Sequence, residues 1–151
     1  MKRVILALLL LSVTTLFALE SDPSETVGFV KYECVTTTGT NLNFIALPMD
    51  AGYAMASDLG TAIGTCDAIS KWDASTQSWI QASDLGFTWA GDYALEDGYT
   101  YMINVTSDTD VYIDGGMITQ PNYSLVTTTG TNLNALMVPL DRSDLAMASD
   151  L

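Results

Sequence analysis

The sequence contains no histidine at any of its 151 positions. This absence excludes the Ser-His-Asp and Cys-His arrangements of nucleophilic catalysis, and it removes the most common nitrogen ligand of zinc sites. The glycine-rich motifs that bind phosphate groups or dinucleotides are missing as well. We therefore expect a protein that is not an enzyme and that requires no cofactor.

Positive charge is also scarce, because five Lys and Arg residues stand against eighteen Asp and Glu, a net charge of −13. Nucleic acids attract clustered Lys and Arg, so we exclude nucleic acid as a partner. Two interpretations of the acidity stay open. It keeps an exported protein soluble, or some of the carboxylates form weak Ca²⁺ sites.

Residues 1–18 contain the longest apolar run and have the layout of a secretory signal peptide. Lys2 and Arg3 precede the apolar run 4–11, and the segment ends at Ala18, where we expect cleavage. An uncleaved anchor is the less favoured alternative, because the run is short for a bilayer. We expect a secreted or cell-surface protein without membrane insertion after cleavage. Loss of two cations then takes the net charge to −15, since all eighteen acids remain.

An internal repeat organises the rest of the chain. Residues 35–43 read VTTTGTNLN, and residues 126–134 repeat these nine letters at an offset of 91. The match continues through 47–50 against 138–141 and, after one inserted residue, through 54–59 against 146–151. We interpret this order as a linker at 19–26, a repeat module at 27–116, a linker at 117–122 and an incomplete second copy at 123–151.

Two explanations of the incomplete copy remain. The favoured one is that the sequence is a fragment of a longer array of modules. The other is that residues 123–151 are a closing element that packs its strand pair on the first module.

The only two cysteines are Cys34 and Cys66. In an oxidising compartment they are able to form a disulfide. The second copy carries Leu125 at the position of Cys34, so a buried unpaired thiol is an equal alternative.

Alternating apolar and polar residues, separated by turn residues, predict an all-β module. We expect a small β-sandwich or partly open barrel with one short helix near 56–63, ended by Gly64 and capped by Ser57 or Asp58. Residues 38–41 are interpreted as a hairpin loop that leads into a strand at 42–47. The other expected strands are 29–35, 68–72, 78–82, 99–105 and 111–113.

Acidic residues gather in two predicted turns. One turn contains Asp92, Glu96 and Asp97, and a pair of such carboxylates is able to act as acid and base in glycoside hydrolysis. The other contains Asp108, Asp110 and Asp114, a candidate Ca²⁺ loop whose Tyr112 and late glycine do not fit an EF-hand. We favour structural turn roles for both groups.

Aromatic residues concentrate in the middle of the module. Trp89 and Tyr93 are the candidate glycan-binding platform, because the segment 86–93 is predicted to be a loop. Trp72 and Trp79 are expected to face each other across a hairpin and to fill the interior.

Four short motifs follow one another along the chain: N-L-N-F-I-A-L-P at 41–48, W-D at 72–73, W at 79 and L-E-D-G-Y-T-Y at 95–101. Their order resembles a β-rich repeat of secreted and surface multidomain proteins of bacteria and archaea. Phe44, Ile45 and Ala46 depart from the Ile-Ser of that outline. The resemblance implies an accessory module of adhesin-like or S-layer-like chains without catalytic residues. We therefore expect a non-catalytic extracellular binding or structural module whose partner is a protein or glycan at the cell surface. The alternative is an accessory region of an exported carbohydrate-active or proteolytic enzyme whose catalytic domain is not in this chain.

Overall fold

The computed structural model describes residues 27–39, 41–130, 132–145, 147 and 149. The predicted signal peptide and the linker at 19–26 lie outside these residues. The described elements are β1 (Val27–Cys34), β2 (Leu42–Ala46), β3 (Met49–Asp50), α2 (Ala56–Ile63), β4 (Cys66–Asp73), β5 (Ser78–Asp84), β6 (Trp89–Ala90), β7 (Thr100–Val105) and β8 (Thr109–Met117).

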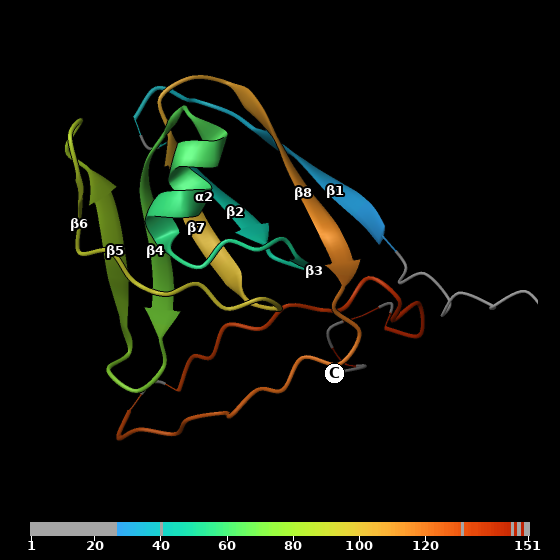
Figure 1. Ribbon diagram of the computed structural model, residues 1–151. Coiled ribbons are helices and arrows are strands. Elements are labelled where there is room, and N and C mark those ends of the chain that lie inside the picture. Colours follow the sequence, from blue (N-terminus) through green and yellow to red (C-terminus); the bar gives the residue numbers. More distant parts are fainter. Residues whose placement is uncertain (1–26, 40, 131, 146, 148, 150–151) are drawn as a thin grey trace, which may run out of the picture.

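The strands form two antiparallel sheets (Figure 1). One sheet has the order β1-β8-β3 and the other has the order β2-β7-β4-β5-β6. In the described part of the chain the sheets do not close into a barrel, and α2 packs on β4 and β5. The prediction of a mostly β sandwich with one short helix is thus confirmed.

The segment between β1 and β2 is an arch, so the prediction of a hairpin at 38–41 was wrong. β1 pairs with β8 along its whole length, and β2 pairs with β7 in the other sheet. The chain therefore crosses from one sheet to the other between Cys34 and Leu42. Gly39, at φ 124°, turns the chain, and the Asn43 side chain bonds both backbone groups of Val35 in place of a strand partner.

Helix α2 confirms the expected bounds and the expected stop. Gly64 follows the helix in the left-handed conformation, at φ 75°, and its N–H donates to the carbonyl of Gly60 at 3.0 Å. At the other end the Asp58 carboxylate accepts a hydrogen bond from the N–H of Met55 at 2.9 Å. Asp58 therefore caps the helix from its third position, and Met55 is the N-cap residue.

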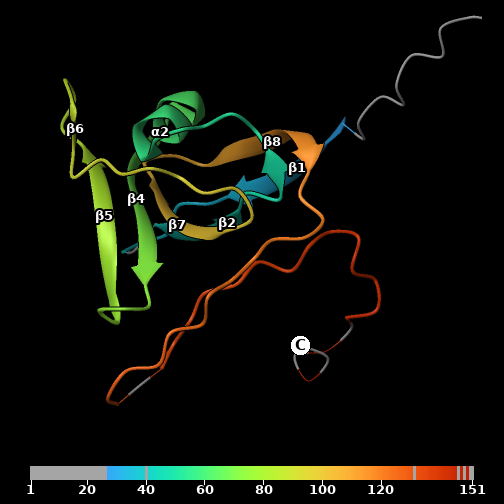
Figure 2. The ribbon, with the colours of Figure 1, turned by 60° about the horizontal axis from the view of Figure 1, so that its bottom comes forward.

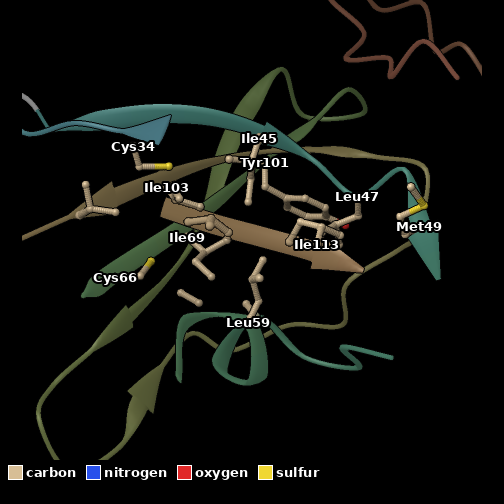
Figure 3. Packing of buried hydrophobic residues seen from close by; sticks show 14 residues of the cluster. Cys34, Ile45, Leu47, Met49, Leu59, Cys66, Ile69, Tyr101, Ile103 and Ile113 are labelled. Carbon is tan, nitrogen blue, oxygen red and sulfur yellow. The ribbon is translucent and has the colours of Figure 1, made fainter. Parts of the chain in front are cut away.

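The hydrophobic core lies between the two sheets and beneath α2 (Figure 3). Leu59 of the helix, Ile69 of β4, Ile103 of β7 and Ile113 of β8 are all fully buried in it. Their burial removes apolar surface from water, which is the main favourable contribution to folding. The other buried apolar members are Cys34, Ile45, Leu47, Met49, Ala56, Cys66, Ala82, Tyr101, Val105 and Val111.

Cys34 and Cys66 both point into this core (Figure 3) and are free thiols in the structure. Burial is the main reason that the pKa of Cys66 is raised to about 12, and burial also raises the pKa of Cys34. Both thiols are therefore neutral and slow to react at physiological pH. Their pairing in a disulfide stays a prediction.

Residues 118–145 run beside the sandwich without strand pairing among the described residues. Figure 2 shows this segment, coloured orange to red, as an extended chain that doubles back on itself. Its contacts with the module include hydrogen bonds: the Leu133 carbonyl accepts from Trp72 Nε1 at 2.8 Å, and Tyr123 Oη donates to the Gly98 carbonyl. Over the described residues, none of the helical structure is long and apolar enough to cross a membrane.

Candidate binding site

The outer face of the five-stranded sheet can be assigned from the alternation in β7. Tyr101, Ile103 and Val105 are buried in the core, so the intervening Thr100, Met102 and Asn104 face away from it. Side chains of directly paired residues in an antiparallel sheet lie on the same face. The pairing register therefore identifies which residues of β2, β4 and β5 also face outward.

Three aromatic residues lie together on this outer face. Phe44 pairs with Met102, and Trp72 pairs with Trp79 across the β4–β5 hairpin. The rings of Trp72 and Trp79 meet edge to face, with centroids 5.3 Å apart, and Phe44 lies 6.3 Å from Trp79. We call Phe44, Trp72, Trp79 and Met102 the aromatic face.

The aromatic face is open to solvent. Phe44 is 66% exposed and Trp79 is 45% exposed, whereas Trp72 is half-buried. The predicted pairing of Trp72 with Trp79 is confirmed, but the expectation that these rings fill the interior was wrong. The interior side of the hairpin is occupied instead by Ile69 and Ala82, which lie on the opposite faces of their strands.

The aromatic face carries no formal charge. The residues around it, grouped by strand, are Leu42 and Ala46 on β2, Thr100 and Asn104 on β7, Ser70 on β4, and Gln81 and Ser83 on β5. Asp67, at the bulge of β4, accepts a hydrogen bond from Asn104. The outer face of β1 and β8 differs sharply, because it presents Lys31, Glu33, Asp110 and Asp114.

Trp89 and Tyr93, the predicted platform, lie at the edge of the core instead of on an open loop. Trp89 belongs to β6, and its ring contacts Gly60 of the helix so closely that a methyl group there would collide with it. The Tyr93 ring is half-buried beneath the Lys71 ammonium, which lies 4.9 Å from the ring centroid. The structure therefore gives both residues packing contacts, and their part in glycan binding stays a prediction.

Asp108, Asp110 and Asp114 do not meet at one point. Asp108 accepts hydrogen bonds from the N–H and the hydroxyl of Thr36, each at 2.7 Å, and so holds the arch. Asp110 pairs with Lys31 at 3.0 Å. Asp114 lies four residues along β8, about 13 Å away in an extended strand. Within the described residues, no three acidic or thiol side chains are grouped to hold a metal ion, and weak Ca²⁺ binding stays a prediction.

The acids at 92–97 also have separate partners. Asp92 accepts from the N–H and the hydroxyl of Ser57, at 3.0 and 2.6 Å, at the start of α2. Glu96 lies 3.7 Å from the Lys71 ammonium. Burial is the main cause of a raised pKa at Asp97, and the nearby Asp50 adds to it. These roles agree with the structural interpretation of the acidic turns.

One hollow was not expected from the sequence. A cavity of about 370 Å³ lies between the module and residues 123–125 and 134–136, lined on the module side by Trp72, Tyr99 and Lys71 and on the other by Tyr123 and Leu136. The rings of Tyr99 and Tyr123 meet edge to face at 5.3 Å. The residues that line this cavity are far apart in the sequence, so no local sequence pattern predicts it.

Phe44 is the site residue that sequence reasoning missed. The available signal was its departure from the Ile-Ser of the repeat outline, combined with its place two residues before Ala46 on an alternating strand. No family model, no curated protein sequence and no solved structure matches this chain. The chain is described by its own geometry, as a β-rich domain with two antiparallel sheets.

Proposed function

We propose that this chain is a non-catalytic extracellular binding module and that the aromatic face binds a neutral glycan. The observation that carries the proposal is the solvent-exposed contact of Phe44, Trp72 and Trp79 on an uncharged sheet surface. Pyranose rings have apolar faces that stack on such aromatic side chains, which supply large apolar area with little loss of conformational freedom.

Polar groups at the rim suit the hydroxyl groups of a sugar. Gln81 and Ser83 lie beside the rings and are hydrogen-bonded to each other at 2.8 Å. Amide and hydroxyl groups both donate and accept, as sugar hydroxyls require. Because Gln81 and Ser83 carry no charge and the Asp67 carboxylate lies beside Asn104 on the same face, a neutral glycan fits better than an acidic one.

The overall charge argues against the other ligand that stacks on aromatic side chains. Single-stranded nucleic acids also use aromatic platforms, but their phosphates need a basic groove. A chain with a net charge of −13 repels them.

Export is supported by the signal-like layout of residues 1–18 and by the resemblance to β-rich repeats of secreted proteins. We therefore place the module in the medium or at the cell surface. The same face would serve equally in an accessory region of an exported carbohydrate-active enzyme, the second function expected from the sequence.

A glycan array, followed by titration calorimetry on the best neutral glycan, tests the proposal. The protein is the chain from residue 19 onward, compared with its Trp79→Ala variant. Loss of one stacked ring should weaken binding about tenfold, which corresponds to roughly 1.4 kcal/mol. The control is Phe87→Ala, because Phe87 is an aromatic residue, 87% exposed, that is not part of the aromatic face.

Phe87→Ala should keep the melting temperature of the wild type within a few degrees, because Phe87 is 87% exposed. Trp79→Ala removes a ring that packs on Trp72 and Phe44, so its melting temperature should fall, and binding is compared at a temperature at which both variants are folded. The proposal fails if no glycan binds, or if Trp79→Ala binds as tightly as Phe87→Ala. Binding of a protein partner through Trp79, with no glycan bound, would replace the glycan by a protein at the same face.

A further inference from the structure

The pairing of β4 with β7 ends before either strand does. The last paired residues are Ser70 of β4 and Met102 of β7, although both strands extend beyond this pair. The cavity of about 370 Å³ lies at this end of the two strands, where it is lined by residues 71–74 and 99–101. It therefore occupies the place where the two neighbouring strands separate.

The far wall of the cavity belongs to the C-terminal segment. Residues 123–125 and 134–136 line it. Between them the chain folds like the arch that joins β1 to β2, because Asn134 bonds both backbone groups of Val126, at 2.9 and 3.1 Å. We call the arch between β1 and β2 the first arch and this segment the second arch.

Hydrogen bonds hold the second arch against the module. The N–H of Leu133 donates to Gln77 Oε1 at 2.8 Å, and the carbonyl of Leu133 accepts from Trp72 Nε1, also at 2.8 Å. Tyr123 Oη donates to the carbonyl of Gly98, shortly before β7 begins. The wall is thus tied to both strands that border the cavity.

The cavity adjoins the aromatic face. Trp72 belongs to both, and Thr100, which faces outward on β7, lines the cavity as well. The ring of Trp72 contacts that of Trp79 on one side, and its Nε1 atom is bonded to Leu133 of the second arch. A linear glycan that stacks on Trp79 and then on Trp72 therefore meets the second arch.

The cavity contains charged groups, which the aromatic face lacks. The Lys71 ammonium lies 3.7 Å from the Glu96 carboxylate, farther apart than in a hydrogen bond, so both groups keep hydrogen-bonding capacity for a ligand. The third charged group, Asp73, is bonded to the hydroxyls of its own turn. The rings of Tyr99 and Tyr123 supply apolar walls.

We propose that this cavity binds the terminal sugar residue of a neutral glycan whose adjoining residues stack on the aromatic face. The inference rests on the proposed function and adds that the module recognises chain ends. Small-molecule pockets measure roughly 300–1,000 Å³, so this cavity suits a ligand as small as one sugar residue.

A terminal sugar has a free hydroxyl group at the position through which an internal sugar is linked. Such a hydroxyl both donates and accepts hydrogen bonds. It accepts from the Lys71 ammonium and donates to the Glu96 carboxylate, and hydrogen bonds to charged groups are stronger than those between neutral groups. An internal sugar lacks this hydroxyl and leaves both charged groups without the ligand bond.

The first test uses only the wild-type chain from residue 19 onward, so no substitution can disturb its folding. Titration calorimetry compares a short and a long fraction of the linear neutral glycan that the glycan array selects. The number of protein molecules bound per glycan chain should be the same for both fractions, because each chain has one end of each kind whatever its length. Binding along the aromatic face alone would raise this number with chain length.

The second test removes the charged donor. Lys71→Met keeps the apolar stem and should weaken binding about tenfold, as expected for the loss of a hydrogen bond to a charged group. Lys31→Met is the matched control, because Lys31 is also ion-paired, with Asp110 at 3.0 Å, but does not line the cavity. This control changes the net charge equally and should bind within about twofold of the wild type.

The outcomes separate this inference from the proposed function. If neither fraction binds, glycan binding is refuted and the chain-end inference with it. If both fractions bind but the number bound grows with chain length, the aromatic face remains a glycan site and the chain-end inference is overturned. Equal affinities of the Lys71→Met and Lys31→Met variants would overturn it in the same way.

Discussion

Replacing Asn43 with alanine should destabilise the module by removing the bonds that hold the first arch. The side chain makes three hydrogen bonds, two to Val35 and one to the carbonyl of Asn41, at 3.0, 3.1 and 3.2 Å. A protein hydrogen bond contributes roughly 0.5–1.5 kcal/mol to stability. Because these bonds are partly exposed to solvent, we expect a total loss of about 2 kcal/mol.

Thermal unfolding followed by circular dichroism measures this loss. For a module of this size, about 2 kcal/mol lowers the melting temperature by roughly 10 °C. Asn134→Ala is the control inside the same chain, because Asn134 makes the same two bonds to Val126 in a segment that pairs with none of the described strands. Its effect on the main transition should be within about 0.5 kcal/mol. Equal effects of the two substitutions would refute the reasoning that only the first arch is part of the folded core.

Two further substitutions test the packing of α2 and the β4–β5 turn. Gly60→Ala should lower the free energy of unfolding by about 1–3 kcal/mol despite the better helix propensity of alanine, because the added methyl group would collide with the Trp89 ring. In the double variant, Trp89→Leu should restore much of this loss. If the effects of the two substitutions on the free energy of unfolding in urea were simply additive, the contact between residue 60 and Trp89 would be contradicted. The turn hydroxyls of Ser75 and Thr76 donate to Asp73 and lower the pKa of its carboxyl group to about 2. The ionised carboxylate therefore stabilises the folded state at pH values above about 4, the pKa in the unfolded chain, and this stabilisation is lost as the pH falls toward 2. The melting temperature of Asp73→Asn should therefore lie below that of the wild type at pH 6 and converge with it near pH 2, and a gap independent of pH would argue against this role.

The local elements of the fold were predictable from the sequence because their signals are local. The spacing of Ala56, Leu59 and Ile63, followed by Gly64, describes the helix completely. The polar run between Trp72 and Trp79 likewise marks a hairpin turn whose register is fixed by its length.

The arch could not be predicted, because its partners are remote. A turn signal such as Gly39 shows that the chain reverses, but β1 finds β8 more than seventy residues away. Only the pairing of β1 with β8 and of β2 with β7 separates the two strands into different sheets.

The binding face was hidden for a related reason. Neighbouring residues of a strand point to opposite faces, so Trp72 and Lys71 lie on different faces of the hairpin, and so do Trp79 and Ile80. Each face of the hairpin therefore contains apolar side chains. The face of the hairpin that becomes buried is the one against which α2 and the three-stranded sheet pack. Composition alone favours burying the largest rings, and the structure buries Ile69 and Ala82 instead.

The pairing of β1 with β8 has a mechanical consequence. Because Val27 pairs with Gly116, the chain enters and leaves the module at the same end of one strand pair. A tensile load applied at these two points pulls perpendicular to the strands and breaks their hydrogen bonds one at a time, like an opening zipper, instead of shearing them together. Under tension the module should therefore yield at low force and lengthen, acting as an extensible spacer and not as a rigid rod.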